Sequence, residues 1–265
     1  MTDLKPSVSD LSRPIGRLKS DTSRRRPLAA LALALALLAA APAAAQAITV
    51  YAAASLRDAF PRIAPNQGYN FAGSGALQTQ IERGAPADVF ASASPKEAQA
   101  LFRAGLCTRP VTFATNVVVL LVPEGNPGNI RSVYNLRRGG RTLAIGIPGV
   151  PIGDYTRRLL ARMRLSSILE ANTVTLEANV SGITSKVALG SVDAGFAYRT
   201  DARIVADRVD VVRLPLWAQP PVRYQACVVR RDGVDAATAG RFVAKLTSRR
   251  GRAVLRSAGF GLPPR

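Results

Sequence analysis

The 265-residue sequence contains no histidine, and this absence excludes several classes of site. A Ser-His-Asp triad and a Cys-His dyad both use an imidazole as the base, and many metal sites use one as a ligand. Ser74 lies in Gly-Ser-Gly but not in a nucleophile elbow, because Ala72 and Ala76 replace its outer glycines. No acidic cluster has a spacing suited to a metal either. We therefore expect no catalytic residue, no metal cation and no cofactor.

Acidic residues are also scarce, with 17 Asp and Glu against 36 Lys and Arg and a formal net charge of +19. Residues 1–46 hold seven basic and three acidic residues, so the remainder keeps a net charge of +15. Such a field attracts anions. The basic residues are scattered and not interleaved with aromatic ones, so we expect no nucleic-acid binding. An arginine-rich composition without functional meaning explains the charge equally well.

Residues 1–46 have the pattern of a cleaved signal peptide. Ser23 to Arg26 supplies positive charge, Leu28 to Ala41 is an unbroken run of Ala and Leu, and Ala43-Ala44-Ala45 offers small residues for cleavage near Ala45. The apolar run is shorter than the roughly 20 residues of a membrane span, which makes a membrane anchor the weaker interpretation. We predict an exported protein, and the sequence leaves open the general secretory and the twin-arginine route.

Only two cysteines are present, Cys107 and Cys227, and both lie in the part predicted to be exported. An exported protein can keep a disulfide bond. Two buried free thiols would leave the same sequence, so both interpretations remain open.

Short apolar and β-branched runs alternate with helical segments, which predicts an α/β fold with mostly parallel sheets. We expect strands at 48–51, 69–71, 89–91, 117–122, 142–145, 174–176, 194–198, 209–212 and 222–229. Helices are expected at 55–63, 75–83, 95–104, 153–163, 180–189, 201–206, 236–246 and 251–258. Residues 123–129, rich in Pro, Gly and Asn, form the clearest loop and predict a crossing between two lobes.

Two serines, Ser55 and Ser74, each follow a short predicted strand and begin a helical segment. A hydroxyl group and free backbone N–H groups at a helix start form an anion site. Two such sites at neighbouring strand ends indicate that the chain binds a small oxyanion. A serine at a helix start is more often a cap without a ligand, so this inference depends on the surrounding pattern.

Four segments in a fixed order carry a resemblance to a known family. They are Ala52-Ala53-Ala54-Ser55-Leu56, Gly84 to Phe90, Val150 to Tyr155, and Val187 to Gly190 with Asp193 to Tyr198. Across nearly all of residues 48–262 the chain resembles the periplasmic molybdate-binding proteins of ABC importers, a group of type II solute-binding proteins. The resemblance implies two lobes, each a mostly parallel sheet flanked by helices, with the ligand cleft between them. We expect residues 47–122 plus 217–265 in lobe I and residues 123–216 in lobe II.

The resemblance also implies a function. The protein would capture molybdate or tungstate in the periplasm and deliver it to an ABC transporter permease in the inner membrane, as a monomer and without catalysis. Five contacts are implied: the hydroxyl groups of Ser55, Ser74 and Tyr198 and the main-chain N–H groups of Ile152 and Val180. Molybdate offers only acceptors, which suits a site made of donors. Hydrogen phosphate carries a proton that such a site leaves unpaired.

Other residues near these motifs are interpreted as structural. Asp88, in a Pro-Ala-Asp turn, is expected to be a hydrogen-bond acceptor, and Trp217 is expected either to pack within a lobe or to lie at a crossing between the lobes. Glu177 and Asn179 are expected near the site without contacting the ligand.

Departures from the family pattern leave alternatives open. Residues 60–70 are shorter than usual and contain Pro61 and Pro65, Ile152 replaces an alanine, and Ser181 stands where many relatives have arginine. Another oxyanion, such as sulfate or thiosulfate, is therefore an alternative ligand. A secreted basic protein that binds acidic polymers is a second alternative, and it would lose affinity steeply with salt. A serine enzyme would require turnover without histidine.

Overall fold

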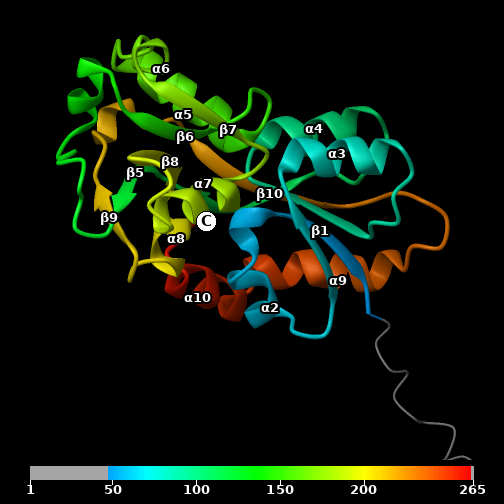
Figure 1. Ribbon diagram of the computed structural model, residues 1–265. Coiled ribbons are helices and arrows are strands. Elements are labelled where there is room, and N and C mark those ends of the chain that lie inside the picture. Colours follow the sequence, from blue (N-terminus) through cyan, green and yellow to red (C-terminus); the bar gives the residue numbers. More distant parts are fainter. Residues whose placement is uncertain (1–46, 264–265) are drawn as a thin grey trace, which may run out of the picture. The chain divides into compact units, whose positions relative to one another are not determined.

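The computed structural model describes residues 47–263, which form two five-stranded sheets (Figure 1). The first sheet has the strand order β2-β1-β3-β10-β4. Its strands are β1 (Thr49–Ala53), β2 (Gly68–Ala72), β3 (Val89–Ser92), β4 (Val111–Asn116) and β10 (Val222–Val228). β1 is parallel to β2 and β3, whereas β10 is antiparallel to β3 and β4. Four strands therefore run in one direction, and β10 runs in the other.

The second sheet repeats this arrangement with the order β7-β6-β8-β5-β9. Its strands are β5 (Val118–Pro123), β6 (Thr142–Gly146), β7 (Thr173–Glu177), β8 (Ala194–Tyr198) and β9 (Val209–Val212). β6 is parallel to β7 and β8, whereas β5 is antiparallel to β8 and β9. The predicted α/β fold with two mostly parallel sheets is confirmed.

Helices connect the parallel strands and flank both sheets (Figure 1). Near the first sheet lie η1 (Ala54–Leu56), α2 (Ala59–Ile63), α3 (Ser74–Glu82), α4 (Pro95–Arg103), α9 (Ala236–Thr247) and α10 (Arg249–Ser257). The others are η2 (Val133–Arg138), α5 (Pro151–Arg162), α6 (Ile168–Ala171), α7 (Val180–Ala188), α8 (Arg199–Ile204) and η3 (Leu216–Ala218). The short η2 and α6 were not predicted, because neither has a sustained helical period.

The helix expected at 55–63 is divided into two short pieces, η1 and α2. Pro61 explains the division, because proline has no N–H group and is tolerated only in the first turn of a helix. In α2, Pro61 is the third residue, a position whose N–H group has no partner in the helix. α2 then ends at Ile63, two residues before Pro65, as the sequence predicted.

The strand expected at 117–122 is present as β5, but it lies in the second sheet and not in the first. Because β5 pairs with β8 and β9, it belongs to the second sheet, whereas the sequence analysis placed it in lobe I. β4, which was not predicted, occupies the edge of the first sheet instead. The first crossing is therefore at Val117, between β4 and β5, and not in the loop at 123–129.

The second crossing lies between β9 and β10 and contains η3. Gln219 ties the two crossings together, because its side-chain amide donates to the Val118 carbonyl at 2.8 Å and accepts from the Val118 N–H group at 2.9 Å. Trp217 lies in η3 at this crossing, which is one of its two predicted roles, and 60% of its surface is accessible, so the alternative packing role is wrong. Each sheet's reversed strand, β5 or β10, is the first strand after a crossing.

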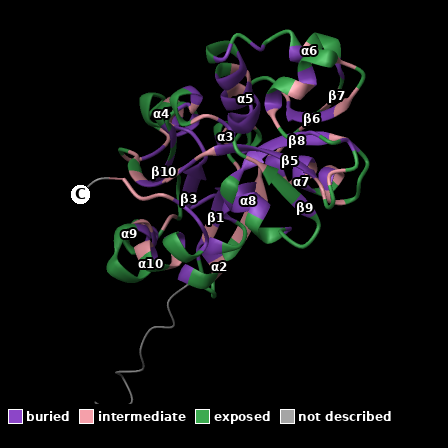
Figure 2. Cartoon of the chain, turned by 90° about the vertical axis from the view of Figure 1, so that its left-hand side faces the viewer, coloured by how far each residue is buried: buried purple, intermediate pink, exposed green. Residues whose placement is uncertain are grey.

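The buried side chains concentrate along the strands of both sheets and on the helix faces turned toward them (Figure 2). One apolar cluster contains residues of both sheets. A second cluster packs α3 and α4 against the first sheet and includes Leu77, Leu101 and Phe90.

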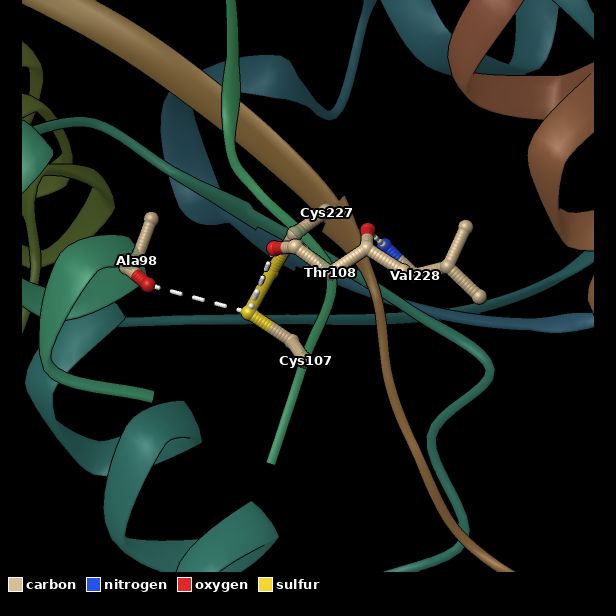
Figure 3. The surroundings of a disulfide bond; sticks show 5 residues. All are labelled: Ala98, Cys107, Thr108, Cys227 and Val228. Carbon is tan, nitrogen blue, oxygen red and sulfur yellow. Dashed lines mark hydrogen bonds between the residues drawn. A yellow bond between two sulfur atoms is a disulfide. The ribbon is translucent and has the colours of Figure 1, made fainter. Parts of the chain in front are cut away.

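Cys107 and Cys227 form a disulfide bond within this second cluster, which resolves the alternative that the sequence left open (Figure 3). Their Cα atoms are 6.0 Å apart, and both residues are fully buried. Cys107 follows α4 and Cys227 lies in β10, so the bond joins segments 120 residues apart in the chain. The Ala98 carbonyl oxygen lies 3.7 Å from the Cys107 sulfur.

The predicted signal peptide, residues 1–46, lies outside the described residues. Between residues 47 and 263, no helix combines the length and the apolar character needed to cross a membrane. The longest helices there, α5 and α9, have 12 residues each, against the roughly 20 of a membrane span.

Candidate functional site

A small cavity of about 20 Å³ lies between the two sheets, at the carboxyl ends of their parallel strands. This is where open α/β sheets usually bind ligands. All five residues that the sequence analysis singled out line it: Ser55, Ser74, Ile152, Val180 and Tyr198. The other lining residues are Ala53, Ala54, Ala72, Gly73, Ala93, Val150, Pro151 and Asn179. The structure therefore brings residues from six segments of the chain to one place.

Four of the five predicted residues lie at the starts of helices. Ser55 lies in η1, Ser74 is the first residue of α3, Ile152 is the second residue of α5 and Val180 is the first residue of α7. The first N–H groups of a helix have no acceptor within the helix, and the helix dipole makes this end positive. The cavity therefore has a positive potential from neutral peptide groups.

The capping of α7 leaves one N–H group free to face the cavity. The Asn179 side chain accepts hydrogen bonds from the N–H groups of Ser181 and Gly182, at 2.9 and 3.3 Å. The Val180 N–H group is not capped by this side chain. α3 and α5 have no side-chain cap at all. Asn179 lines the cavity, so it is closer to the site than the sequence analysis expected.

The two serine hydroxyl groups are buried and already hold one hydrogen bond each. Ser74 Oγ accepts from the Ala93 N–H group at 3.1 Å. Ser55 Oγ lies 2.9 Å from the hydroxyl oxygen of Tyr224, on β10. Both serines are at most 2% exposed, so little water competes for them.

Tyr198 stands at the end of β8 and is 1% exposed. Its hydroxyl group has no hydrogen-bond partner within residues 47–263, which is uncommon for a buried polar atom. Burial raises the pKa of Tyr198 well above its usual value, so the hydroxyl group keeps its proton. Tyr198 thus offers an unused donor to whatever occupies the cavity.

The Tyr198 ring is held by edge-to-face contacts with Tyr155 and Tyr224, with centroid distances of 6.4 and 6.1 Å. Tyr155 and Tyr198 belong to the second sheet region and Tyr224 to the first. These aromatic contacts join the two halves next to the cavity.

Among the described residues that line the cavity, none carries a charge. Glu97 and Asp201 are buried carboxyl groups, but they do not line it. The Lys96–Asp154 ion pair, at 3.3 Å, joins α4 to α5 across the two halves. Because Lys96 is 63% exposed, this pair contributes little stability.

The bulky Ile152, where the resembled family has alanine, does not fill the cavity. The residue is 1% exposed, and one of its methyl carbons lies 2.9 Å from the position that a Cβ of Gly146 would take, which is too close for a real Cβ atom. Glycine at 146 therefore makes room for the isoleucine behind the site. The main-chain N–H group at 152 does not depend on this side chain.

The two halves approach so closely that Gly73 cannot carry a side chain. A Cβ atom at Gly73 would overlap the carbonyl oxygen of Ala178, which follows β7 in the second sheet. The sequence alone did not reveal this contact, because the two residues are more than 100 positions apart.

Asp88 has the structural role that the sequence predicted. Its carboxylate accepts from the Thr49 N–H group at 2.7 Å and pairs with Arg231 at 2.6 Å. Glu177 pairs with Lys186 at 2.6 Å and does not line the cavity. Tyr224 and Asn116 gave no functional signal in the sequence, because Tyr224 lies in a predicted strand without a motif and Asn116 lies in β4, which was not predicted.

A family model described as bacterial extracellular solute-binding protein matches residues 48–261. The chain is 40% identical over 229 residues to the molybdate-binding protein ModA of Mycobacterium tuberculosis H37Rv, covering 83% of this chain and 86% of that one. It is 32% identical over 231 residues to ModA of Escherichia coli K12, covering 80% and 88%.

Two solved structures share the fold. The periplasmic molybdate-binding protein of Azotobacter vinelandii has a TM-score of 0.70 at 24% identity, covering 82% of this chain and all of that one. The sulfate-binding protein SubI of Mycobacterium tuberculosis H37Rv has a TM-score of 0.66 at 19% identity, covering 81% and 86%.

Proposed function

The chain belongs to the family of bacterial extracellular solute-binding proteins, and we propose that it captures molybdate and tungstate in the cavity between its two sheets. The observation that carries the proposal is the set of donors around that cavity. Helix starts, two serine hydroxyl groups and the unpaired Tyr198 hydroxyl group all line it, and no carboxylate does.

The proposed ligand contacts are five. The hydroxyl groups of Ser55, Ser74 and Tyr198 and the N–H groups of Ile152 and Val180 donate to the oxygens of the anion. A molybdate dianion is fully ionised near neutral pH and has only acceptors. Burying its charge is costly unless its oxygens are hydrogen-bonded, which explains why donors come from both sheets.

The two sheets are the proposed lobes, which close around the anion in a hinge motion. With the first crossing at Val117, residues 47–116 and the C-terminal return through β10, α9 and α10 form one lobe. Residues 118–212 form the other. Val117 and the segment between β9 and β10 are then the hinge, with Gln219 joining them.

In the cell, the protein is proposed to be exported to the periplasm, where it delivers its ligand to an ABC transporter permease as a monomer. The relatives whose names describe them as molybdate-binding proteins support this role. The part proposed for this protein is binding and release of the anion.

Calorimetric titration of residues 46–265 with molybdate, tungstate and sulfate, at two salt concentrations, tests the proposal. We expect one-to-one binding of molybdate and tungstate, weak binding of sulfate and a small effect of salt. Preference for sulfate would indicate another oxyanion transporter. Absence of binding to all three would contradict the proposed function, and a steep salt dependence would indicate binding of acidic polymers.

A further inference from the structure

Asn116, the last residue of β4, is buried next to the first crossing and makes three hydrogen bonds. Its Oδ1 accepts from the Val117 N–H group at 3.0 Å. Its Nδ2 lies 2.9 Å from Thr200 Oγ1 and 3.3 Å from the Tyr224 hydroxyl oxygen. Only the oxygen of an amide side chain can accept from a backbone N–H group. The contact with Val117 therefore fixes which end of the Asn116 amide is Oδ1 and which is Nδ2. Asn116 therefore donates to both Thr200 and Tyr224.

This donation fixes the direction of the next hydrogen bond. Tyr224 is fully buried, and burial raises the pKa of its hydroxyl group well above the usual value, so the proton is present. Within residues 47–263, the Tyr224 hydroxyl group has two partners, Asn116 and Ser55. Since Asn116 is a donor, Ser55 Oγ is the acceptor available to the buried Tyr224 proton. Tyr224 therefore donates to Ser55.

Ser55 Oγ in turn accepts from Tyr224, and the Ser55 proton is left free to point elsewhere. Its Oγ has no other side-chain or backbone partner within the described residues, and Ser55 lines the cavity. The Ser55 O–H bond is thus directed at the ligand. The Ser74 hydroxyl group is in the same position: its Oγ accepts from the Ala93 N–H group, which leaves the Ser74 proton free for a ligand.

We propose that Tyr224, held by Asn116, is a positioning residue that turns the Ser55 O–H group toward the ligand, so that Ser55 donates to the ligand and does not accept from it. This inference rests on the proposed anion-binding function and concerns its specificity. A fully deprotonated oxyanion can use the fixed donor. A protonated oxyanion, such as hydrogen phosphate, would place its own proton against the serine proton that already points at the ligand.

The variant Tyr224→Phe removes the hydroxyl group and keeps the ring, which packs against Phe113 and Phe260. The hydrogen bonds from Asn116 to Tyr224 and from Tyr224 to Ser55 are called the relay below. Without the relay, the Ser55 hydroxyl group is free to rotate and to accept from a ligand. At pH 7 we expect about tenfold weaker molybdate binding and a ratio of molybdate to phosphate affinity that narrows by about tenfold or more.

A matched control is Tyr69→Phe. The Tyr69 hydroxyl group donates to the Ala64 carbonyl at 2.6 Å, and Tyr69 does not line the cavity. This variant loses the same atom from a partly buried hydrogen bond, so we expect lower stability with an unchanged affinity ratio. Thermal unfolding of both variants shows whether each one is folded.

A double-mutant cycle with Ser55→Ala separates positioning from general structural support. If Tyr224 acts through Ser55, Tyr224→Phe has no further effect on affinity in the Ser55→Ala background. An unchanged ratio in Tyr224→Phe, or an equal loss in both backgrounds, overturns the relay while leaving the function intact. A wild-type protein that binds neither molybdate, tungstate nor sulfate overturns the proposed function and the relay together.

Discussion

At the scale of single residues, Ser74 gives the most direct test of the site. Replacing it with alanine removes a proposed hydroxyl donor to the anion and leaves the buried Ala93 N–H group without its acceptor. A hydrogen bond to a charged group contributes about 1.5–3 kcal/mol, so Ser74→Ala should weaken molybdate binding by roughly 10- to 150-fold in calorimetry. The exposed Ser257→Ala is the control. Unchanged affinity in Ser74→Ala would remove Ser74 from the ligand contacts.

Asp201, in the first turn of α8, should make stability depend on pH. Burial raises its pKa to about 7, whereas an unfolded aspartate titrates near pH 4. The folded state therefore holds a proton that the unfolded state releases between these two values. The contribution of this group to the free energy of unfolding is fully present below about pH 4 and is lost as pH rises to about 7.

Asp201→Asn should remove this dependence, because an amide does not titrate. We expect the variant to gain stability relative to the wild type as pH rises from about 4 to 8, by an amount on the order of a few kcal/mol. Chemical denaturation across this range measures it, with the exposed Asp207→Asn as the control. Parallel curves for Asp201→Asn and the wild type would show that the carboxyl group is charged in the folded protein.

The residues of the site differ in how far sequence could identify them. Ser55 and Ser74 were recognisable because each begins a helical segment after a short strand. Tyr198 was singled out through the family resemblance, and so were Ile152 and Val180, whose main-chain N–H groups have no side-chain signature. Tyr224 and Asn116 were missed, because their hydrogen bonds join residues that only the fold brings together.

At the scale of helices and strands, the start of α3 shows how close packing shapes the site. Gly73 has φ −65° and ψ 136°, a conformation that alanine adopts without strain. The obstacle to a side chain is therefore the Ala178 carbonyl oxygen across the cavity. Gly73→Ala should keep the first lobe folded and hinder closure, with a loss of molybdate affinity of about tenfold or more.

Gly240→Ala is the matched control for this prediction. Gly240 lies within α9, and an added Cβ atom there would meet nothing within 4 Å. We expect an unchanged affinity and a gain in stability of up to about 1 kcal/mol, because alanine favours the helix. If Gly73→Ala binds as tightly as Gly240→Ala, the contact between Gly73 and Ala178 does not limit closure.

The local sequence pattern indicated whether a segment is a helix or a strand. It did not indicate which strands pair with each other in a sheet. The wholly apolar segment at 118–122 was correctly predicted as a buried strand, yet it was assigned to the wrong sheet. Apolar residues on both faces indicate burial without indicating between which layers. The division of the first helix was also missed, although Pro61 contained the signal for it.

At the scale of the whole molecule, the two crossings place the two sheets around one site. Each sheet has four strands in one direction and one reversed strand that follows a crossing. The carboxyl ends of both sets of parallel strands therefore meet at the cavity, where six segments supply its lining. A net charge of +15 over residues 47–265 adds a general attraction for anions, which the uncharged cavity itself does not need.

The disulfide bond joins the two chain segments that form the first sheet, and its removal should act on the whole molecule. Cys107 and Cys227 are 120 residues apart, and a loop of about this length stabilises the folded state by roughly 4–5 kcal/mol in the chain-entropy account. For a domain of this size the reduced protein should melt about 10 °C or more below the oxidised one.

Affinity for molybdate should survive reduction at 25 °C, because neither cysteine lines the cavity. The double variant with both cysteines replaced by alanine should melt at the temperature of the reduced wild type, and reductant should not affect it further. Equal melting temperatures with and without reductant in the wild type would show that the bond contributes nothing. A parallel loss of affinity would show that the cluster under α3 positions Ser74, whose helix it supports through Leu77.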